Sequence, residues 1–181
     1  SKSPSRYVLP KVVQSAKGCH LHTADGRELL DFGMGLGACV LGYNHPEVNQ
    51  AVVDAIAEGT LFTLPSYREA QAAEAILGYI PWADQVRFAR NGTDVTTAAV
   101  RVARAATGRS TVAHCGYHGW ADWSMTKHPA LGVPHQSSFA FTRYEWQEIG
   151  WRPLAPLAAI VVEIAQQGVV DEPFYQSLRE W

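Results

Sequence analysis

The sequence predicts an α/β fold built around a largely parallel sheet. Three observations lead to this prediction. Segments typical of strands alternate along the chain with segments of helical periodicity. A glycine turn joins a strand-like segment to a helix-like one at residues 90–93, and the continuous apolar run Leu157–Val162 is typical of a strand that is covered on both faces.

The N-terminal third predicts a hairpin followed by two helices. Two short alternating runs within residues 19–32 flank Asp25-Gly26, a dipeptide that suits a tight turn. Residues from Pro46 to Gly59 predict an amphipathic helix, and residues 66–79 repeat its pattern. The apolar face expected for the first helix consists of Val48, Ala51, Val52, Ala55 and Ile56.

The rest of the chain continues the alternation. Residues 85–90 alternate like a strand, Asn91-Gly92 breaks the pattern, and residues 93–106 predict a helix that stops at Gly108. Further strands are expected near residues 111–114, at 137–142 and at 157–162, and a last helix begins at Phe174. One side of the 93–106 helix carries the apolar residues Val95, Ala98, Ala99, Val102 and Ala106.

The composition is that of an ordinary globular protein. Hydrophobic residues make up 47% of the 181 residues and charged residues 18%. A net charge of -2 gives no basic footprint, so we expect neither nucleic acid nor an anionic membrane surface as a main partner. No apolar run is long enough to span a bilayer, and three sparse cysteines indicate a reducing compartment, so a cytoplasmic location is expected.

Three other classes of site receive little support. A dinucleotide fingerprint fails because the spacing is G-x-G-x-G at Gly33, Gly35 and Gly37. No metal is expected, because glycines make a shared helical face for His114 and His118 improbable. Finally, the G-x-S-x-G motif of many hydrolases is missing from the sequence.

The strongest candidate site is the turn Asn91-Gly92-Thr93. Glycine lets the backbone approach an anion closely, and the helix that follows directs its free N–H groups and positive dipole end toward the same point. A phosphate group would bind there. The local pattern is equally compatible with a simple turn in which Thr93 or Asp94 caps the helix.

Two further candidates follow predicted strands. Tyr117 and His118 follow the strand near residues 111–114, and Glu163 follows the apolar strand at 157–162. Taken singly, Tyr117 could pack under a loop and Glu163 could be merely solvated. However, the carboxyl ends of parallel strands share one edge, where open α/β sheets bind ligands, so these residues and Gly92 are expected to meet in one crevice.

At these positions the sequence resembles the class III, fold-type I enzymes that depend on pyridoxal 5'-phosphate (PLP), most closely the glutamate-1-semialdehyde 2,1-aminomutase-like branch. The resemblance covers nearly the whole chain through segments that match in order: SKSPSRY, DGRELLDF, LGYNHPEV, RFARNGTDVTTAAVRVARAATGR, GYHGWADW and AAIVVE. It implies an aminotransferase or aminomutase that acts on an amino or keto/aldehyde substrate, and a homodimer.

The resemblance also implies roles for individual residues. Gly92 and Thr93, with Asn91 beside them, would hold the PLP phosphate, and Tyr117 would stack on the pyridine ring. His118 would lie close by, Glu163 would lie near the ring, and Arg6 would bind the substrate carboxylate. Where relatives carry N-S-G-T-E-A-T, this chain has R-N-G-T-D-V-T, which keeps the phosphate turn but changes the side chain at Asn91.

Two residues needed for catalysis have no match in this chain. The Schiff-base lysine of the family, and the aspartate that keeps the pyridine nitrogen protonated, correspond to positions beyond Trp181. The resemblance therefore implies the first part of a fold-type I protein, with residues 1–58 contributing to the small domain and 59–181 to an incomplete PLP-binding large domain. This chain alone is expected to be inactive.

Two alternatives stay open. The first is a non-catalytic, half-length protein that binds a phosphorylated ligand or acts as a partner subunit. The second is an α/β protein in which the turn at Asn91 has no ligand.

Overall fold

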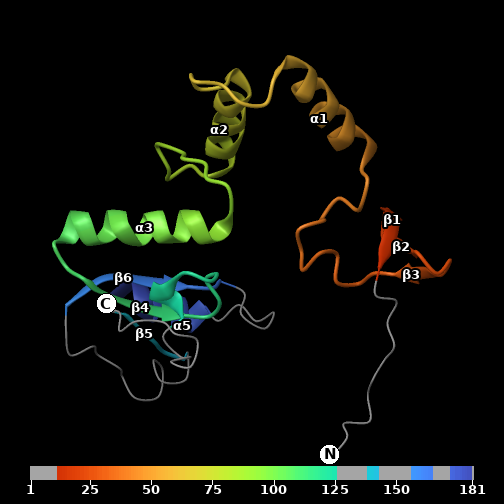
Figure 1. Cartoon of the computed structure of the whole chain (residues 1–181). Helices are drawn as coiled ribbons and strands as arrows, with labels where there is room; N and C mark the ends of the chain where they lie inside the picture. The colour runs from red at the N-terminus through yellow and green to blue at the C-terminus, as the bar shows by residue number, and fades with distance from the viewer. Residues whose placement is uncertain (1–11, 126–137, 143–155, 165–171, 181) are drawn as a thin grey trace, which may run out of the picture. The chain divides into compact units, whose positions relative to one another are not determined.

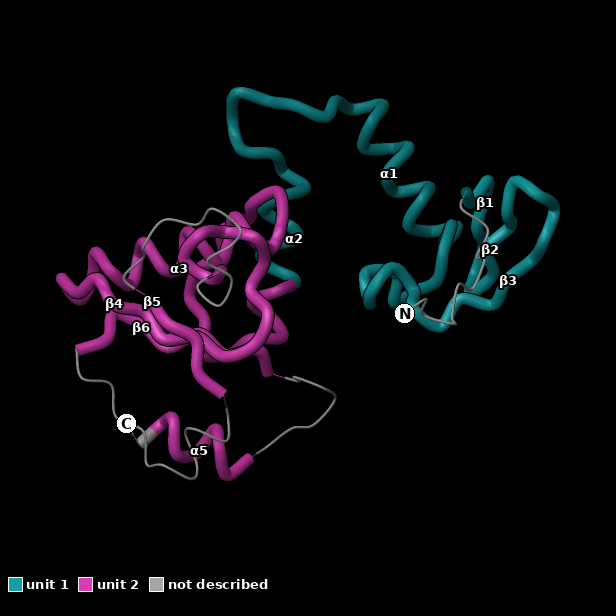
Figure 2. Tube along the Cα trace, turned by 60° about the horizontal axis from the view of Figure 1, so that its bottom comes forward, with its two compact units in different colours: residues 1–75 teal, residues 76–181 magenta. Residues whose placement is uncertain are grey.

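Figure 1 shows the computed structural model of the chain, which describes residues 12–125, 138–142, 156–164 and 172–180. The chain divides into two compact units, residues 1–75 and 76–181 (Figure 2). The first contains a sheet of strands β1, β2 and β3 and helix α1, and helix α2 begins in it; the second contains the remaining elements. The element bounds are β1 Val13–Lys17, β2 His20–Thr23, β3 Glu28–Leu30, α1 Pro46–Glu58, α2 Tyr67–Tyr79, α3 Gly92–Thr107, β4 Thr111–Cys115, η1 Asp122–Ser124, β5 Ser138–Ala140, β6 Leu157–Val162 and α5 Glu172–Glu180.

The hairpin predicted around Asp25-Gly26 is confirmed. Strands β2 and β3 pair antiparallel, with β1 on the other side of β2. The Thr23 N–H donates to the Arg27 carbonyl at 2.9 Å, and Gly26 has a φ of +83°, a left-handed conformation that glycine adopts without strain. The Asp25 carboxylate accepts from the Arg27 guanidinium, which with the Thr23 hydroxyl lowers the pKa of Asp25 to about 2.

Both predicted helices of the N-terminal third form where expected. Helix α1 starts with proline at its first turn, and the Gly59 N–H closes it by donating to the Ala55 carbonyl at 3.1 Å. Its predicted apolar face is exposed, since Val52 and Ile56 keep 53% and 59% of their surface. Periodicity identified the helix correctly, and within the first unit no described element covers that stripe.

The second unit contains the parallel sheet that the sequence predicted. Strand β4 lies in the middle, with β5 and β6 parallel to it on either side. Its side chains alternate between two small cores, as expected for a strand covered on both faces. Val112 packs with Val100 of α3 and Trp123, whereas Ala113 and Cys115 pack with Phe174 of α5. Helices α3 and α5 therefore cover opposite faces of the sheet.

The strand predicted for residues 85–90 does not form, and this segment is irregular. Alternation of apolar and polar side chains favours an extended backbone, but a strand also needs a neighbour to satisfy its N–H and C=O groups. Neither sheet includes these residues, and the parallel sheet consists of β5, β4 and β6 among the described residues. The prediction was wrong because the partner strand was not considered.

Helix α3 forms where the sequence predicts a helix, but its apolar side is not the side that packs on the sheet. Val100 is buried, while Val95 and Val102 of the apolar side keep 40% and 68% of their surface. The buried side includes the half-buried Thr96 and Thr97, whose hydroxyls are hydrogen-bonded. Because these polar groups have partners, threonines can face the sheet at little cost, which a hydrophobic pattern does not show.

No helix in the described part of the chain combines the length and apolar character needed to cross a membrane.

Candidate functional site

The N-terminus of α3 has donors directed away from the helix. Asn91 is the N-cap: its backbone is extended, and its Oδ1 accepts from the Asp94 N–H at 2.9 Å. The alternative in which Thr93 or Asp94 caps the helix is therefore wrong. Among the described residues, no group accepts from the N–H of Gly92 or Thr93, and a Cβ at Gly92 would meet no atom within 4 Å. Two helix N–H groups thus have no described acceptor, and the space beside Gly92 is open.

The loop after β4 lies directly against this helix end. The Thr96 hydroxyl of α3 lies 3.3 Å from the His118 carbonyl and 3.1 Å from the Thr93 carbonyl, and its one proton is shared between these two acceptors. Gly119, at a φ of +92°, packs so closely on Thr93 that a Cβ would overlap Thr93 Oγ1 and lie 3.1 Å from its Cβ. Glycine is needed here both for the backbone angle and for the close approach. The loop and the first turn of α3 form one surface.

Glu163 links the same loop to the end of β6. Its N–H donates to the Cys115 carbonyl at 2.9 Å, which extends the β4–β6 pairing by one residue. Its carboxylate Oε2 then accepts from the Tyr117 N–H at 3.1 Å. Gly116 lies beneath the carboxylate at a φ of +98°, and a Cβ there would approach Glu163 Cβ to 2.5 Å. The backbone at Tyr117 is therefore fixed from the neighbouring strand.

His118 is a buried, neutral support behind this loop. Its Nε2 lies 2.9 Å from the Cys115 carbonyl, so this nitrogen carries the proton and donates. The imidazole stacks on the Trp123 indole, with ring centroids 5.9 Å apart and 24° between the planes. Burial lowers the pKa of His118 below its ordinary value, although the Cys115 hydrogen bond and the Glu163 charge act in the opposite direction.

The structure brings most of the residues singled out in the sequence to one edge. Thr93, Tyr117, His118 and Glu163 are joined by the contacts above, and Tyr117 keeps 64% of its surface exposed beside them. Arg6 lies outside the described residues. The geometry therefore offers anion-binding N–H groups next to an exposed aromatic ring, while the binding roles of these residues stay predictions.

Sequence reasoning missed three residues of this edge. Gly119 and Thr96 make the contacts that join the loop to α3, and Trp123 packs behind His118. A signal for Gly119 was present in the G-Y-H-G spacing, because two glycines three residues apart after a strand indicate a loop with left-handed turns. The hydroxyl of Thr96 and the ring of Trp123 leave no such local signature.

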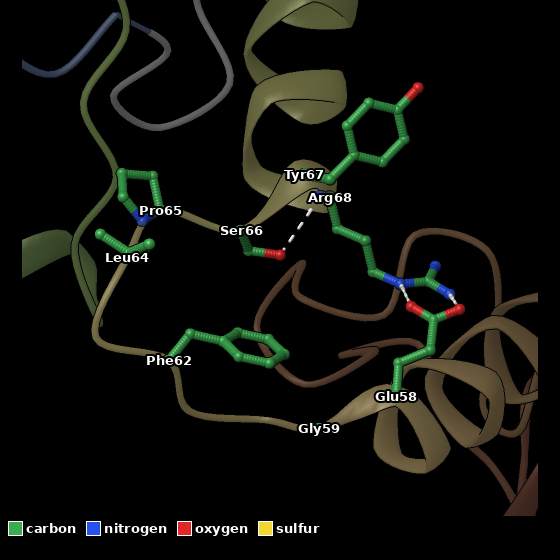
Figure 3. Close-up of a pocket in the computed structure, with 8 residues that line it drawn as sticks. All are labelled: Glu58, Gly59, Phe62, Leu64, Pro65, Ser66, Tyr67 and Arg68. Atoms are coloured by element: carbon green, nitrogen blue, oxygen red, sulfur yellow. Dashed lines mark hydrogen bonds and ion pairs between the residues drawn. The ribbon is translucent and has the colours of Figure 1, made fainter.

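A separate pocket of about 270 Å³ lies between α1 and α2 in the first unit (Figure 3). Its walls are largely apolar, and the ring of Phe62 packs over Gly59. The Arg68 guanidinium donates to both oxygens of Glu58 at 2.8 Å, so this cation is already engaged. The pocket includes none of the residues predicted from the sequence. Its lining consists of Glu58, Gly59, Phe62, Leu64, Pro65, Ser66, Tyr67 and Arg68.

No group of three or more histidine, cysteine, aspartate or glutamate side chains that could hold a metal ion occurs within the part of the chain that the structure describes. The rings of His114 and His118 lie edge to face with centroids 5.8 Å apart, in an aromatic cluster with Trp123.

Comparison with known proteins decides the family. The family model described as aminotransferase class-III matches residues 2–137. The chain belongs to the class III aminotransferases. This confirms the resemblance drawn from the motifs, and the similarity to solved transaminases, one of them with PLP bound, places the fold among the PLP-dependent transferases of fold type I.

Two curated relatives of this family show how the chain compares along its length. It is 40% identical over 131 residues to a glutamate-1-semialdehyde 2,1-aminomutase of Anaeromyxobacter dehalogenans, covering 69% of this chain and 30% of the relative. It is 35% identical over 176 residues to a 2'-deamino-2'-hydroxyneamine transaminase of Streptomyces kanamyceticus, covering 94% of this chain and 45% of the relative. The chain thus spans less than half the length of these relatives.

Solved transaminase structures agree with the fold. A transaminase solved with PLP bound superposes with a TM-score of 0.82 at 26% identity, covering 99% of this chain and 46% of that one. A β-phenylalanine aminotransferase from Variovorax paradoxus gives a TM-score of 0.78 at 27% identity, covering 97% of this chain and 44% of that one.

Proposed function

We propose that the complete protein is a PLP-dependent aminotransferase or aminomutase, and that this chain supplies much of its cofactor site. Membership of the class III family supports the reaction class. The observation that carries the proposal for this chain is the meeting of the α3 N-terminus, Tyr117 and Glu163 at one sheet edge.

The α3 N-terminus fits the phosphate group. The N–H groups of Gly92 and Thr93 are the donors that a phosphate needs, and the helix dipole favours its negative charge. Asn91 stabilises the turn because its side chain accepts from the Asp94 N–H and donates to the Asp94 carboxylate. In our proposal Asn91 therefore shapes the cradle through its cap, while the two N–H groups bind the anion.

The neighbouring loop fits the aromatic ring of the cofactor. Tyr117 presents an exposed ring beside the phosphate turn, and Glu163 fixes its backbone through a hydrogen bond. His118 lies behind the loop and, being neutral, adds no positive charge there. We propose that Tyr117 stacks on the ring and that Glu163 and His118 hold Tyr117 in place.

When bound, PLP supplies a conjugated ring that withdraws electrons from the reacting carbon of an amine substrate. The residues of this chain bind and orient that group. We propose that Arg6 binds the substrate carboxylate. None of the lysines of this chain is proposed to form the Schiff base with PLP; they are Lys2, Lys11, Lys17 and Lys127. This chain by itself is therefore expected to bind the cofactor without turnover.

Three further features belong to the proposal for the complete protein. It acts on an amine or amino acid substrate, with transfer to a keto or aldehyde group. It forms a homodimer, as fold-type I resemblance implies, and it works in the cytoplasm, which its few and scattered cysteines support. Partners of other kinds, nucleic acid and membrane among them, are not part of the proposal.

Direct binding to the chain tests the cofactor site. Tryptophan fluorescence of the 181-residue chain titrated with PLP gives a Kd, and titrations with pyridoxal and with inorganic phosphate separate the ring from the anion. Gly92→Asp introduces a carboxylate beside the two N–H groups, at a position where a Cβ would meet no atom within 4 Å. Since acidic residues stabilise helix N-termini, this variant stays folded, and it should weaken PLP binding by about tenfold or more through charge repulsion.

Gly92→Asn is the matched control, because it has the same shape without the charge. We expect it to bind PLP more tightly than Gly92→Asp does. Equal Kd values for wild type and Gly92→Asp, or for PLP and pyridoxal, would contradict a phosphate site at α3. A phenyl phosphate that binds as tightly as PLP would favour the alternative, a protein that binds phosphorylated ligands in general.

A further inference from the structure

We propose that Trp123 is a positioning residue for the cofactor site, acting through His118 on the loop that presents Tyr117. This inference rests on the proposed function. Trp123 lies in the short helix η1 and is only 4% exposed, so it cannot touch a ligand at the sheet edge itself. Its effect on the site must therefore pass through the residues that it contacts.

The indole of Trp123 is anchored on two sides. Its Nε1–H donates to the Thr97 hydroxyl of α3 at 3.2 Å, and its ring belongs to the core cluster with Val100 and Val112. The Ser138 hydroxyl of β5 donates to the Trp123 carbonyl at 2.7 Å. A large aromatic ring held by a hydrogen bond and by close packing has a fixed orientation, so Trp123 is a rigid platform.

His118 rests on this platform. The two rings stack at 24° with centroids 5.9 Å apart. The imidazole also donates from Nε2 to the Cys115 carbonyl at 2.9 Å. The ring therefore cannot rotate without losing either the stacking or the hydrogen bond. Since His118 follows Tyr117 directly, fixing the His118 side chain restricts the backbone from which the Tyr117 ring extends.

The residues on either side of His118 in the loop are held by other contacts. The Glu163 carboxylate accepts from the Tyr117 N–H, and Gly119 packs on Thr93. These contacts fix the loop ends against β6 and α3. Between them, the Thr96 hydroxyl contacts the His118 carbonyl, and Trp123 fixes the His118 ring. Without the stacking, His118 would move and Tyr117 would present its ring in several orientations.

The test separates support of Tyr117 from mere support of the core. Trp123→Leu removes the stacking, and Trp123→Phe keeps an aromatic ring while losing the N–H donor. We expect Trp123→Leu to weaken PLP binding about threefold to tenfold, the range typical of an aromatic contact, with little change in the Kd for inorganic phosphate. Trp123→Phe should restore the Kd for PLP to within about twofold of wild type, because the stacking remains.

A double-mutant cycle gives the decisive readout. If Trp123 acts through Tyr117, adding Trp123→Leu to Tyr117→Ala should weaken PLP binding no further than Tyr117→Ala alone. Additive losses, or a Kd for Trp123→Leu equal to that of wild type, would overturn the inference. Should Trp123→Leu fail to fold, Trp123→Met fills more of the same space without an aromatic ring, and it should weaken PLP binding in the same direction because the stacking on His118 is lost.

A measurement without ligand distinguishes this inference from the proposed function. Amide hydrogen exchange of the free chain should rise at residues 116–119 in Trp123→Leu and stay unchanged in the β2–β3 hairpin. If wild type binds PLP but exchange at 116–119 is unaffected, the positioning role is wrong while the cofactor site stands. If wild type fails to bind PLP at all, the proposed function and this inference both fall.

Discussion

Gly119→Ala tests the contact that joins the loop to α3. At a φ of +92° an L-residue is strained, which costs about 1–3 kcal/mol. The new Cβ would also overlap Thr93 Oγ1 and lie 3.3 Å from Thr93 Cα. Backbone cannot yield as a flexible side chain can, so overpacking adds about 1–3 kcal/mol. The expected loss in free energy of unfolding is therefore about 2–6 kcal/mol.

Gly108→Ala is the matched control in the same unit. Gly108 also has a positive φ, +66°, but a Cβ there would meet no atom within 4 Å. It should cost about 1–3 kcal/mol from strain alone. Urea unfolding, read from the midpoint and slope, measures both variants. The difference between them isolates the contact with Thr93.

A second variant tests the contact between Gly119 and Thr93 Oγ1 directly. Thr93→Ala removes Oγ1, so it should recover part of the stability lost in Gly119→Ala. The recovery is incomplete because Thr93 Cβ still lies 3.1 Å from the new Cβ. If Gly119→Ala costs no more than Gly108→Ala, or if Thr93→Ala recovers nothing, the close packing of the loop on α3 is wrong.

Two further predictions concern the same edge. Asn91→Ala should lower the free energy of unfolding by about 1 kcal/mol through loss of the cap, while Asn91→Asp, which keeps an acceptor, should stay near wild type; urea midpoints check this. The lowered pKa of His118 means that the unfolded chain binds its proton more readily. Its contribution to stability is complete above about pH 6.5 and decreases as the pH falls through the ordinary pKa toward the folded one. His118→Gln should flatten this dependence between about pH 7.5 and 5.5 in urea unfolding, and a slope equal to that of wild type would show that His118 is not the group responsible.

Element ends encoded by local chemistry could be predicted from the sequence. Helix α3 begins at the Asn91-Gly92 turn and ends at Gly108, which adopts a φ of +66° as a C-cap. The β2–β3 turn at Asp25-Gly26 and the apolar strand β6 were equally clear. In each case a few neighbouring residues contain the whole signal, because caps and turns are made by local hydrogen bonds and backbone angles.

Features that depend on distant partners could not be predicted in this way. The side of α3 that faces the sheet depends on Trp123, which packs with Val100 and donates to the Thr97 hydroxyl 26 residues earlier in the chain. Residues 85–90 have the alternation of a strand but no described neighbour to pair with. For the candidate site, parallel strand ends correctly placed Tyr117 beside Glu163, whereas the supporting ring of Trp123 depends on packing that no spacing rule describes.

The central place of β4 in its sheet also affects how this unit folds. Both neighbours of β4 come later in the sequence: Val112 pairs with Ser138 on one side and with Ala159 on the other. During synthesis both edges of β4 therefore stay unpaired until long intervening segments have been made. Loop closure of this kind is slow and leaves apolar strand edges open to other chains. We expect the pairing of β6 with β4 to limit the rate at which this unit refolds, and the refolding yield to fall as protein concentration rises.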